Sequence, residues 1–151
     1  MFVLALEEAV KLKSLPTHEE LMEQGKLVEW REGMGAVAFM SQTWLSGSHP
    51  DNQENVKCAL LVAFLKRVMD GTVSITCHWQ AEAVYGRKAT SVSTKEMCQS
   101  LRYVWFDVMS VPQADPAQQQ LAIASIASYV AEASYFVILA GVRCIASRSR
   151  L

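Results

Sequence analysis

The sequence lacks the features that mark several special classes of protein. It has four cysteines and no Cys-x-x-Cys pair, so the thiols are expected to be reduced in an intracellular, cytoplasmic setting. Its three histidines are scattered, and Cys77 beside His78 does not supply the three or four convergent ligands that zinc needs. There is no internal repeat and no low-complexity tract. The sequence therefore predicts neither a disulfide scaffold nor a metal site.

An excess of charge of one sign and a long apolar run are also missing. The 14 Lys and Arg balance the 15 Asp and Glu to a net charge of −1, which predicts no nucleic-acid or anionic-membrane partner. No segment reaches the ~20 apolar residues of a membrane-spanning helix. Glu7 and Glu8 interrupt an N-terminus without a basic region, which argues against a cleaved signal peptide. With 51% apolar residues in 151, one compact domain is expected.

Three short, continuous apolar runs stand out in this composition, at residues 36–40, 103–106 and 135–139. Continuous rather than alternating hydrophobicity is typical of strands that are covered on both faces, as in a parallel sheet packed between helices. Their aromatic and β-branched content favours strand over helix. The three runs therefore predict the core strands of an α/β domain.

A helix is expected between the first two runs. Asp51 and Glu54 have the spacing of a capping box, and Gly71 suits the position after the last helical residue. Helical spacing predicts a buried stripe on this helix, formed by Val56, Leu60, Ala63, Phe64 and Val68.

A second helix is expected between the second and third runs. Asp115 is its predicted N-cap, Pro116 suits the first helical position, and Gln118 completes a capping box. Its predicted inner face consists of Ile123, Ile126, Ala127, Val130 and Ala133. Together the segments form a βαβαβ unit, whose crossovers should be right-handed.

The remaining segments are less regular. Thr17 and Glu20 predict a capping box on a short helix that ends at Gly25, and residues 27–30 predict a minor strand. A helix is expected at about residues 94–101. The predicted organisation is a helical extension and lead-in at 1–34, an α/β core at 35–142 with an insertion at 72–102, and a basic, frayed tail at 143–151.

Ligands of an open parallel sheet bind beyond the carboxyl ends of its strands. Two loops that follow predicted strands, 41–50 and 107–113, supply the candidate pocket residues Ser41, Gln42, Trp44, Asp107 and Gln113. Asp107 directly follows four apolar residues, so burial would require partners such as Ser41, Thr43 or loop amides. A structural role is the simpler interpretation of Asp107, with catalysis as the rival, and Trp44 either stacks on a ligand or packs at the rim.

Motifs of familiar enzymes are missing. The sequence has no Gly-x-Ser-x-Gly, no Walker phosphate loop and no Gly-x-Gly-x-x-Gly. The Gly33-Met34-Gly35 turn precedes a strand, so it does not place a helix N-terminus on a phosphate. The residues alone predict no catalytic constellation and no cofactor.

The order of the motifs nevertheless resembles a known family. The strand ending in Trp-x-Asp, the loop ending in Gln, the helix and the second apolar strand resemble the heterokaryon-incompatibility (HET) domain. The upstream segments look like a TIR/HET-like group expanded in algal protists, where TIR is the Toll/interleukin-1 receptor domain. The segments that carry the resemblance are Pro16–Leu21, Gly25–Trp30, Phe39–Leu45, His49–Asp51, Tyr103–Asp107, Pro112–Gln113, Ala122–Val130 and Ser134–Leu139.

The resemblance implies a flavodoxin-like, TIR-like three-layer fold with core strand order 2-1-3. It also implies either assembly with like domains in signalling and self-recognition, or cleavage of NAD by a glutamate on the helix after the third or fourth core strand. No Asp or Glu follows Glu132, and Gln42 stands where relatives of this group often have His. The leading hypothesis is therefore a non-catalytic interaction domain, incomplete at its C-terminus, with homotypic partners or self-association.

Two alternatives remain open at this stage. The first is an NAD-consuming or nucleotide-binding domain that uses Ser41, Trp44 and Asp107, with NAD as its substrate; a carboxylate there would stabilise oxocarbenium-like charge on the ribose. The second is a fragment without an independent function. Under the leading hypothesis the run at 135–139 is an exposed sheet edge, which would favour pairing with another chain.

Overall fold

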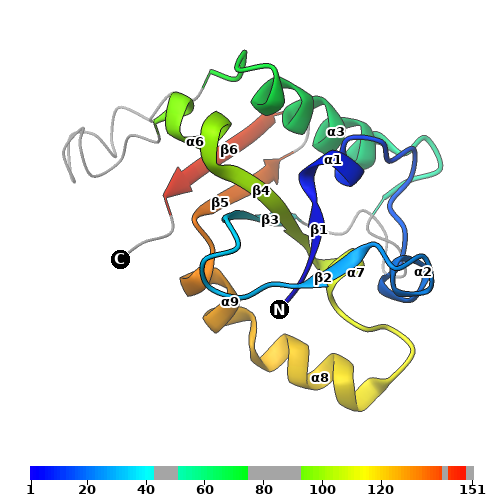
Figure 1. Cartoon of the computed structure of the whole chain (residues 1–151). Coiled ribbons are helices and arrows are strands. Elements are labelled where there is room, and N and C mark those ends of the chain that lie inside the picture. Colours follow the sequence, from blue (N-terminus) through cyan, green and yellow to red (C-terminus); the bar gives the residue numbers. More distant parts are fainter. Residues whose placement is uncertain (43–50, 75–92, 141–142, 149–151) are drawn as a thin grey trace.

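The fold is a six-stranded sheet between two layers of helices (Figure 1). This computed structural model describes residues 1–42, 51–74, 93–140 and 143–148, and the last of these segments is described by its backbone alone. The strand order is β2-β1-β4-β3-β5-β6. Figure 1 places α3 on one side of the sheet and α8 and α9 on the other. The predicted three-layer α/β class is confirmed.

The three predicted core strands are present and lie side by side. They are β3 (Ala36–Gln42), β4 (Leu101–Phe106) and β5 (Tyr135–Ala140), and β3 pairs in parallel with both neighbours. Phe39 of β3 lies opposite Trp105 of β4 and Phe136 of β5. The core strand that comes first in the chain, β3, is thus central among the three, which is the 2-1-3 order.

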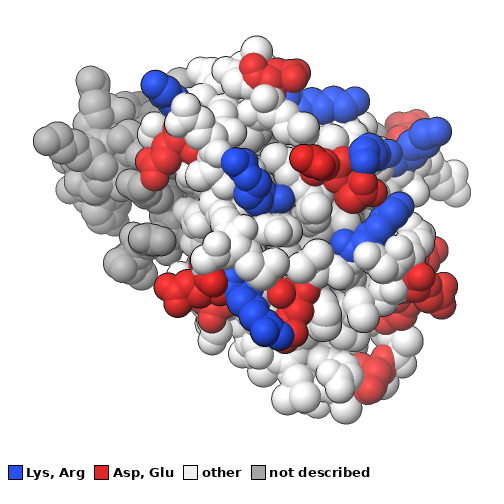
Figure 2. Space-filling model, viewed as in Figure 1, with Lys and Arg blue, Asp and Glu red and all other residues white. Residues whose placement is uncertain are grey.

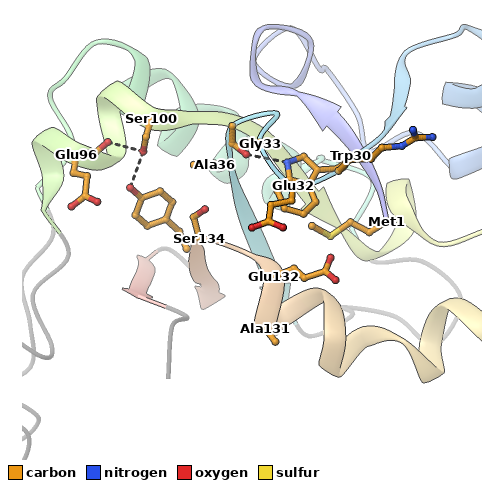
Figure 3. Close-up of a pocket in the computed structure, with 13 residues that line it drawn as sticks. Met1, Trp30, Glu32, Gly33, Ala36, Glu96, Ser100, Ala131, Glu132 and Ser134 are labelled. Atoms are coloured by element: carbon orange, nitrogen blue, oxygen red, sulfur yellow. Dashed lines mark hydrogen bonds between the residues drawn. The ribbon is translucent and has the colours of Figure 1, made fainter.

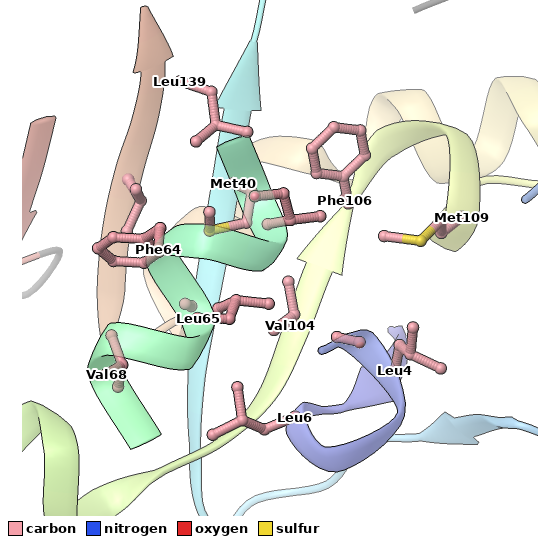
Figure 4. Packing of buried hydrophobic residues seen from close by; sticks show 14 of the residues in the cluster. Leu4, Leu6, Met40, Phe64, Leu65, Val68, Val104, Phe106, Met109 and Leu139 are labelled. Carbon is pink, nitrogen blue, oxygen red and sulfur yellow. The ribbon is translucent and has the colours of Figure 1, made fainter. Parts of the chain in front are cut away.

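Burial on both faces explains why these strands are continuously apolar. Successive residues of β3 enter different cores: Ala38 and Met40 join the larger cluster, whereas Val37 and Phe39 join the smaller one. Figure 4 shows the larger cluster, in which Phe64 and Leu65 of α3 pack near Met40. In the smaller cluster the rings of Phe39 and Trp105 stack at 4.1 Å between centroids.

Helix α3 (Val56–Met69) begins later than its capping signal predicts. Its N-cap is Asn55, with a left-handed φ of 54° and no side-chain cap. The predicted Asp51–Glu54 capping box is therefore wrong, although Gly71 does follow the helix with a positive φ. The predicted stripe is also displaced, because Val56 and Ala63 are exposed. The buried residues of α3 are Lys57, Cys58, Leu61, Phe64, Leu65 and Val68.

The second predicted helix is divided into α8 (Pro116–Ala124) and α9 (Ile126–Glu132). Asp115 caps α8 by accepting hydrogen bonds from the amides of Ala117 and Gln118, as predicted, and Pro116 occupies the first position. The predicted inner face is only partly correct. Ala133 is buried and Ile126 and Val130 pack partly on the smaller core, but Ile123 and Ala127 are exposed.

Residues 1–34, expected as a helical extension, also supply two strands of the sheet. The segment consists of β1 (Phe2–Ala5), α1 (Leu6–Ala9), α2 (His18–Glu23) and β2 (Leu27–Glu29). Strand β1 pairs antiparallel with both β2 and β4. The predicted minor strand is confirmed as β2, and the Thr17–Glu20 capping box on α2 has both of its hydrogen bonds.

The far edge of the sheet differs from expectation. Residues 143–148, predicted to be part of a frayed tail, form β6 (Arg143–Arg148), which pairs antiparallel with β5 along its length. The run at 135–139 is therefore not an exposed edge, because β6 pairs with β5 along it. Two short helices complete the described elements, α6 (Thr94–Ser100), near its predicted position, and α7 (Asp107–Ser110). None of the described helices is long and apolar enough to cross a membrane.

Candidate functional site

Two of the predicted pocket residues meet at the carboxyl edge of the core strands. The Gln42 amide nitrogen, at the end of β3, donates to the Asp107 carboxylate at 3.1 Å. The same carboxylate oxygen accepts the amide of Val108 at 2.7 Å, in the first turn of α7. Residues 107–110 are thus a helical turn with buried Val108 and Met109, not the polar loop that was predicted. Asp107 thus accepts hydrogen bonds that hold the local structure, as in the structural role considered above, and Gln42 and Val108 are among its partners.

Asp51, which the sequence identified only as a cap, belongs to the same edge. Its side chain is buried, and its two carboxylate oxygens accept the amides of Lys57 at 2.9 Å and Cys58 at 2.8 Å. A third bond comes from the amide of Asn52 at 2.9 Å. The amides of Lys57 and Cys58 belong to the first turn of α3, so Asp51 caps the helix across an intervening turn.

Lys57 was not a candidate, yet it is the most unusual group at this edge. It is only 6% exposed, and its ammonium nitrogen has no hydrogen-bond partner. Burial lowers the pKa of Lys57, against the opposing attraction of Asp107 and Asp51. The Gln42 amide oxygen is likewise buried without a partner. An unpaired donor and an unpaired acceptor therefore lie close to two carboxylates.

The other predicted pocket residues do not join this cluster within the described structure. The Gln113 side chain donates to the Val111 carbonyl oxygen and accepts from Gln119, while its backbone amide donates to Glu19. Ser41 is half-buried near the end of β3. Trp44 lies outside the described residues, as do Thr43, His49 and the Cys77–His78 pair.

A cavity of about 850 Å³ lies at the opposite edge, near the amino ends of β3 and β5 (Figure 3). Sequence reasoning did not anticipate it, because its lining comes from distant segments. They are Met1, residues 30–33, 35 and 36, α6, the end of α9 and the start of β5. The Trp30 indole N–H donates to the Gly35 carbonyl at 3.0 Å, which fixes the ring on the wall. Gly35 itself has a φ of 121°, a conformation that disfavours other residues.

The outer surface of α8 is the third feature that stands out. None of its nine residues is buried, and Leu121 and Ile123 are 65% and 54% exposed. They emerge on opposite flanks of the helix, on either side of Ala122, which packs on the smaller core. No charged residue occurs from 116 to 131, and the surface over α8 is mainly white in Figure 2. Exposed apolar side chains on an uncharged surface are typical of contact sites.

Neither metal ligation among the described residues nor similarity to known proteins adds to this description. Across the described ranges no three His, Cys, Asp or Glu side chains are grouped so that they could hold a metal ion. No family model, no curated protein and no solved structure matches the chain.

Proposed function

We propose that the chain is a TIR/HET-like protein-interaction domain that associates with a second copy of itself through the outer surface of α8. The observation that carries the proposal is the exposure of Leu121 and Ile123 on a helix without charge. Burial of either side chain at an interface would add roughly 1.5–3 kcal/mol from its apolar surface, reduced by the cost of association.

The lack of charge favours a second copy as the partner. In a two-fold symmetric contact the same surface meets itself, so a charge close to the symmetry axis faces its own copy. Residues 116–131 contain no Asp, Glu, Lys or Arg, and this repulsion is therefore absent there. The core strand order 2-1-3 is compatible with the TIR/HET-like resemblance that suggested homotypic assembly.

Leu121→Lys should weaken self-association at least about tenfold, because an ammonium in a desolvated contact costs more than 1.4 kcal/mol. Sedimentation velocity across a wide range of concentration measures the effect. Met69→Lys is the matched control, since Met69 is 48% exposed at the end of α3 and should leave association unchanged. A wild-type protein that stays monomeric throughout, or one equally sensitive to both changes, would contradict the proposal.

The carboxyl edge supports a second candidate, an NAD-consuming or nucleotide-binding activity. The specific observation is the buried pair of unpartnered atoms, Lys57 Nζ and Gln42 Oε1, beside the Asp107 carboxylate. A ligand that accepts from the first and donates to the second would satisfy both.

Incubation with NAD, with nicotinamide release as the readout, separates the two candidates. For an interaction domain no release above a heat-denatured control is expected. For the second candidate, release should occur and fall at least about tenfold in Asp107→Asn, as for a lost transition-state contact. Circular dichroism of the variant would establish that it is folded.

A further inference from the structure

Lys57 is a nucleophilic group that the proposed interaction surface does not use. It is the second residue of α3 and only 6% exposed, and within the described part of the chain its Nζ has no hydrogen-bond partner. Burial of an ammonium favours the neutral amine, and the pKa of Lys57 is lowered mainly for this reason. A neutral lysine amine attacks a carbonyl carbon, whereas a lysine in its ammonium form does not. Lys57 is therefore a better nucleophile than an exposed lysine.

Lys57 also lies at the edge of the sheet where ligands of α/β proteins bind. The parallel strands β3 and β4 end at Gln42 and Phe106, and α3 follows β3 in the chain. Open α/β sheets bind ligands beyond these carboxyl ends. The Gln42 amide nitrogen donates to Asp107 at 3.1 Å, and the Asp107 carboxylate attracts the Lys57 ammonium. Asp107 is thus the common neighbour of Gln42 and Lys57.

The surroundings of Lys57 define the kind of ligand that suits it. The Gln42 amide oxygen is buried without a partner, so it needs a donor such as a hydroxyl group. The carboxylates of Asp107 and Asp51 attract the Lys57 ammonium, and they would repel a ligand with a negative charge. The small exposed fraction of Lys57 restricts access to short molecules. A short, neutral ligand with a hydroxyl donor meets these conditions.

From these features we infer that Lys57 forms an imine with a small, neutral hydroxyaldehyde whose hydroxyl group donates to Gln42 Oε1. The ammonium first loses a proton to solvent. The lone pair of the amine then forms a bond to the carbonyl carbon, and the π electrons of the carbonyl move to its oxygen, which takes a proton from the nitrogen. The remaining amine hydrogen leaves with this new hydroxyl group as water, and the C=N bond forms. No oxidant or reductant is consumed. The inference is independent of the proposed self-association, because neither residue belongs to α8.

Reductive trapping with glycolaldehyde at pH 7 tests the inference. Cyanoborohydride in the assay adds hydride to the imine and converts it to a stable secondary amine, which mass spectrometry of the peptides locates and quantifies. Lys57 should be labelled at least about threefold faster than Lys66, because a larger fraction of the Lys57 side chain is neutral amine. Lys66 is the internal control, since it is an exposed lysine of the same helix. Labelling of Lys57 no faster than that of Lys66 would overturn the inference.

Propanal tests the role of Gln42, because it has a methyl group where glycolaldehyde has its hydroxyl. The rate at Lys57 relative to Lys66 should be about two- to tenfold lower with propanal, the effect of one hydrogen bond. Gln42→Leu, checked for folding by circular dichroism, should abolish this preference. Equal relative rates of the two aldehydes in the wild type, which need no variant, or a preference that survives in folded Gln42→Leu, would overturn the inference. The readout is an adduct at Lys57 without NAD, so it does not depend on either candidate function.

Discussion

Asp51→Ala should lower the free energy of unfolding by about 3 kcal/mol, an effect that is large for one side chain away from the apolar core. The variant loses three hydrogen bonds to a carboxylate, from the amides of Asn52, Lys57 and Cys58. Hydrogen bonds to charged groups contribute about 1.5–3 kcal/mol each, though not additively. The amides of Lys57 and Cys58 belong to buried residues, so water cannot easily replace the lost acceptor.

Asp115→Ala is the matched control. It removes a carboxylate that accepts two amides at the start of α8, at 2.9 and 3.2 Å, but at an exposed position where water can replace it. A loss of about 1 kcal/mol is expected there. Urea unfolding of both variants, with unchanged m values, measures the difference. Equal losses would mean that burial of Asp51 adds nothing to its capping.

The contrast between these two caps shows how far local sequence patterns can predict the fold. Asp115 and Thr17 cap helices at the spacing that side-chain geometry requires, and both were correctly predicted. Asp51 reaches the same kind of amides across a turn in which Asn55 is left-handed. A pattern of adjacent residues cannot reveal that path, because it depends on how the turn packs on the sheet.

The same reasoning separates the strands that were predicted from those that were not. β3, β4 and β5 can be predicted from the sequence because burial on both faces requires a continuous apolar run. The sequence of β6, Arg-Cys-Ile-Ala-Ser-Arg, lacks such a run. This segment forms a strand because its backbone pairs with the edge of β5. The burial of Lys57 and the cavity near the amino ends of β3 and β5 likewise depend on tertiary packing. The periodicity of apolar residues in the sequence does not reveal them.

Lys57→Met should raise the free energy of unfolding by about 1 kcal/mol at neutral pH. Two effects compete at this position: the cost of burying the ammonium and its attraction to Asp107 and Asp51. The pKa of Lys57 is lowered, with burial as the largest cause, so the cost exceeds the attraction. Replacing a buried charge by an apolar side chain of similar length then stabilises the fold, as for other buried ionic groups.

The pH dependence gives this result a distinctive sign. Because the folded state holds the Lys57 proton more weakly than the unfolded state does, the wild type regains stability as pH rises from the lowered folded-state pKa toward the ordinary value of 10.5. The advantage of Lys57→Met should therefore be fully present below that window and shrink as pH rises through it. Lys66→Met, at an exposed position of the same helix, should show neither the gain nor the trend. A loss of stability in Lys57→Met at pH 7 would instead mean that attraction to the two carboxylates outweighs burial, and that the ammonium has a partner at the carboxyl edge.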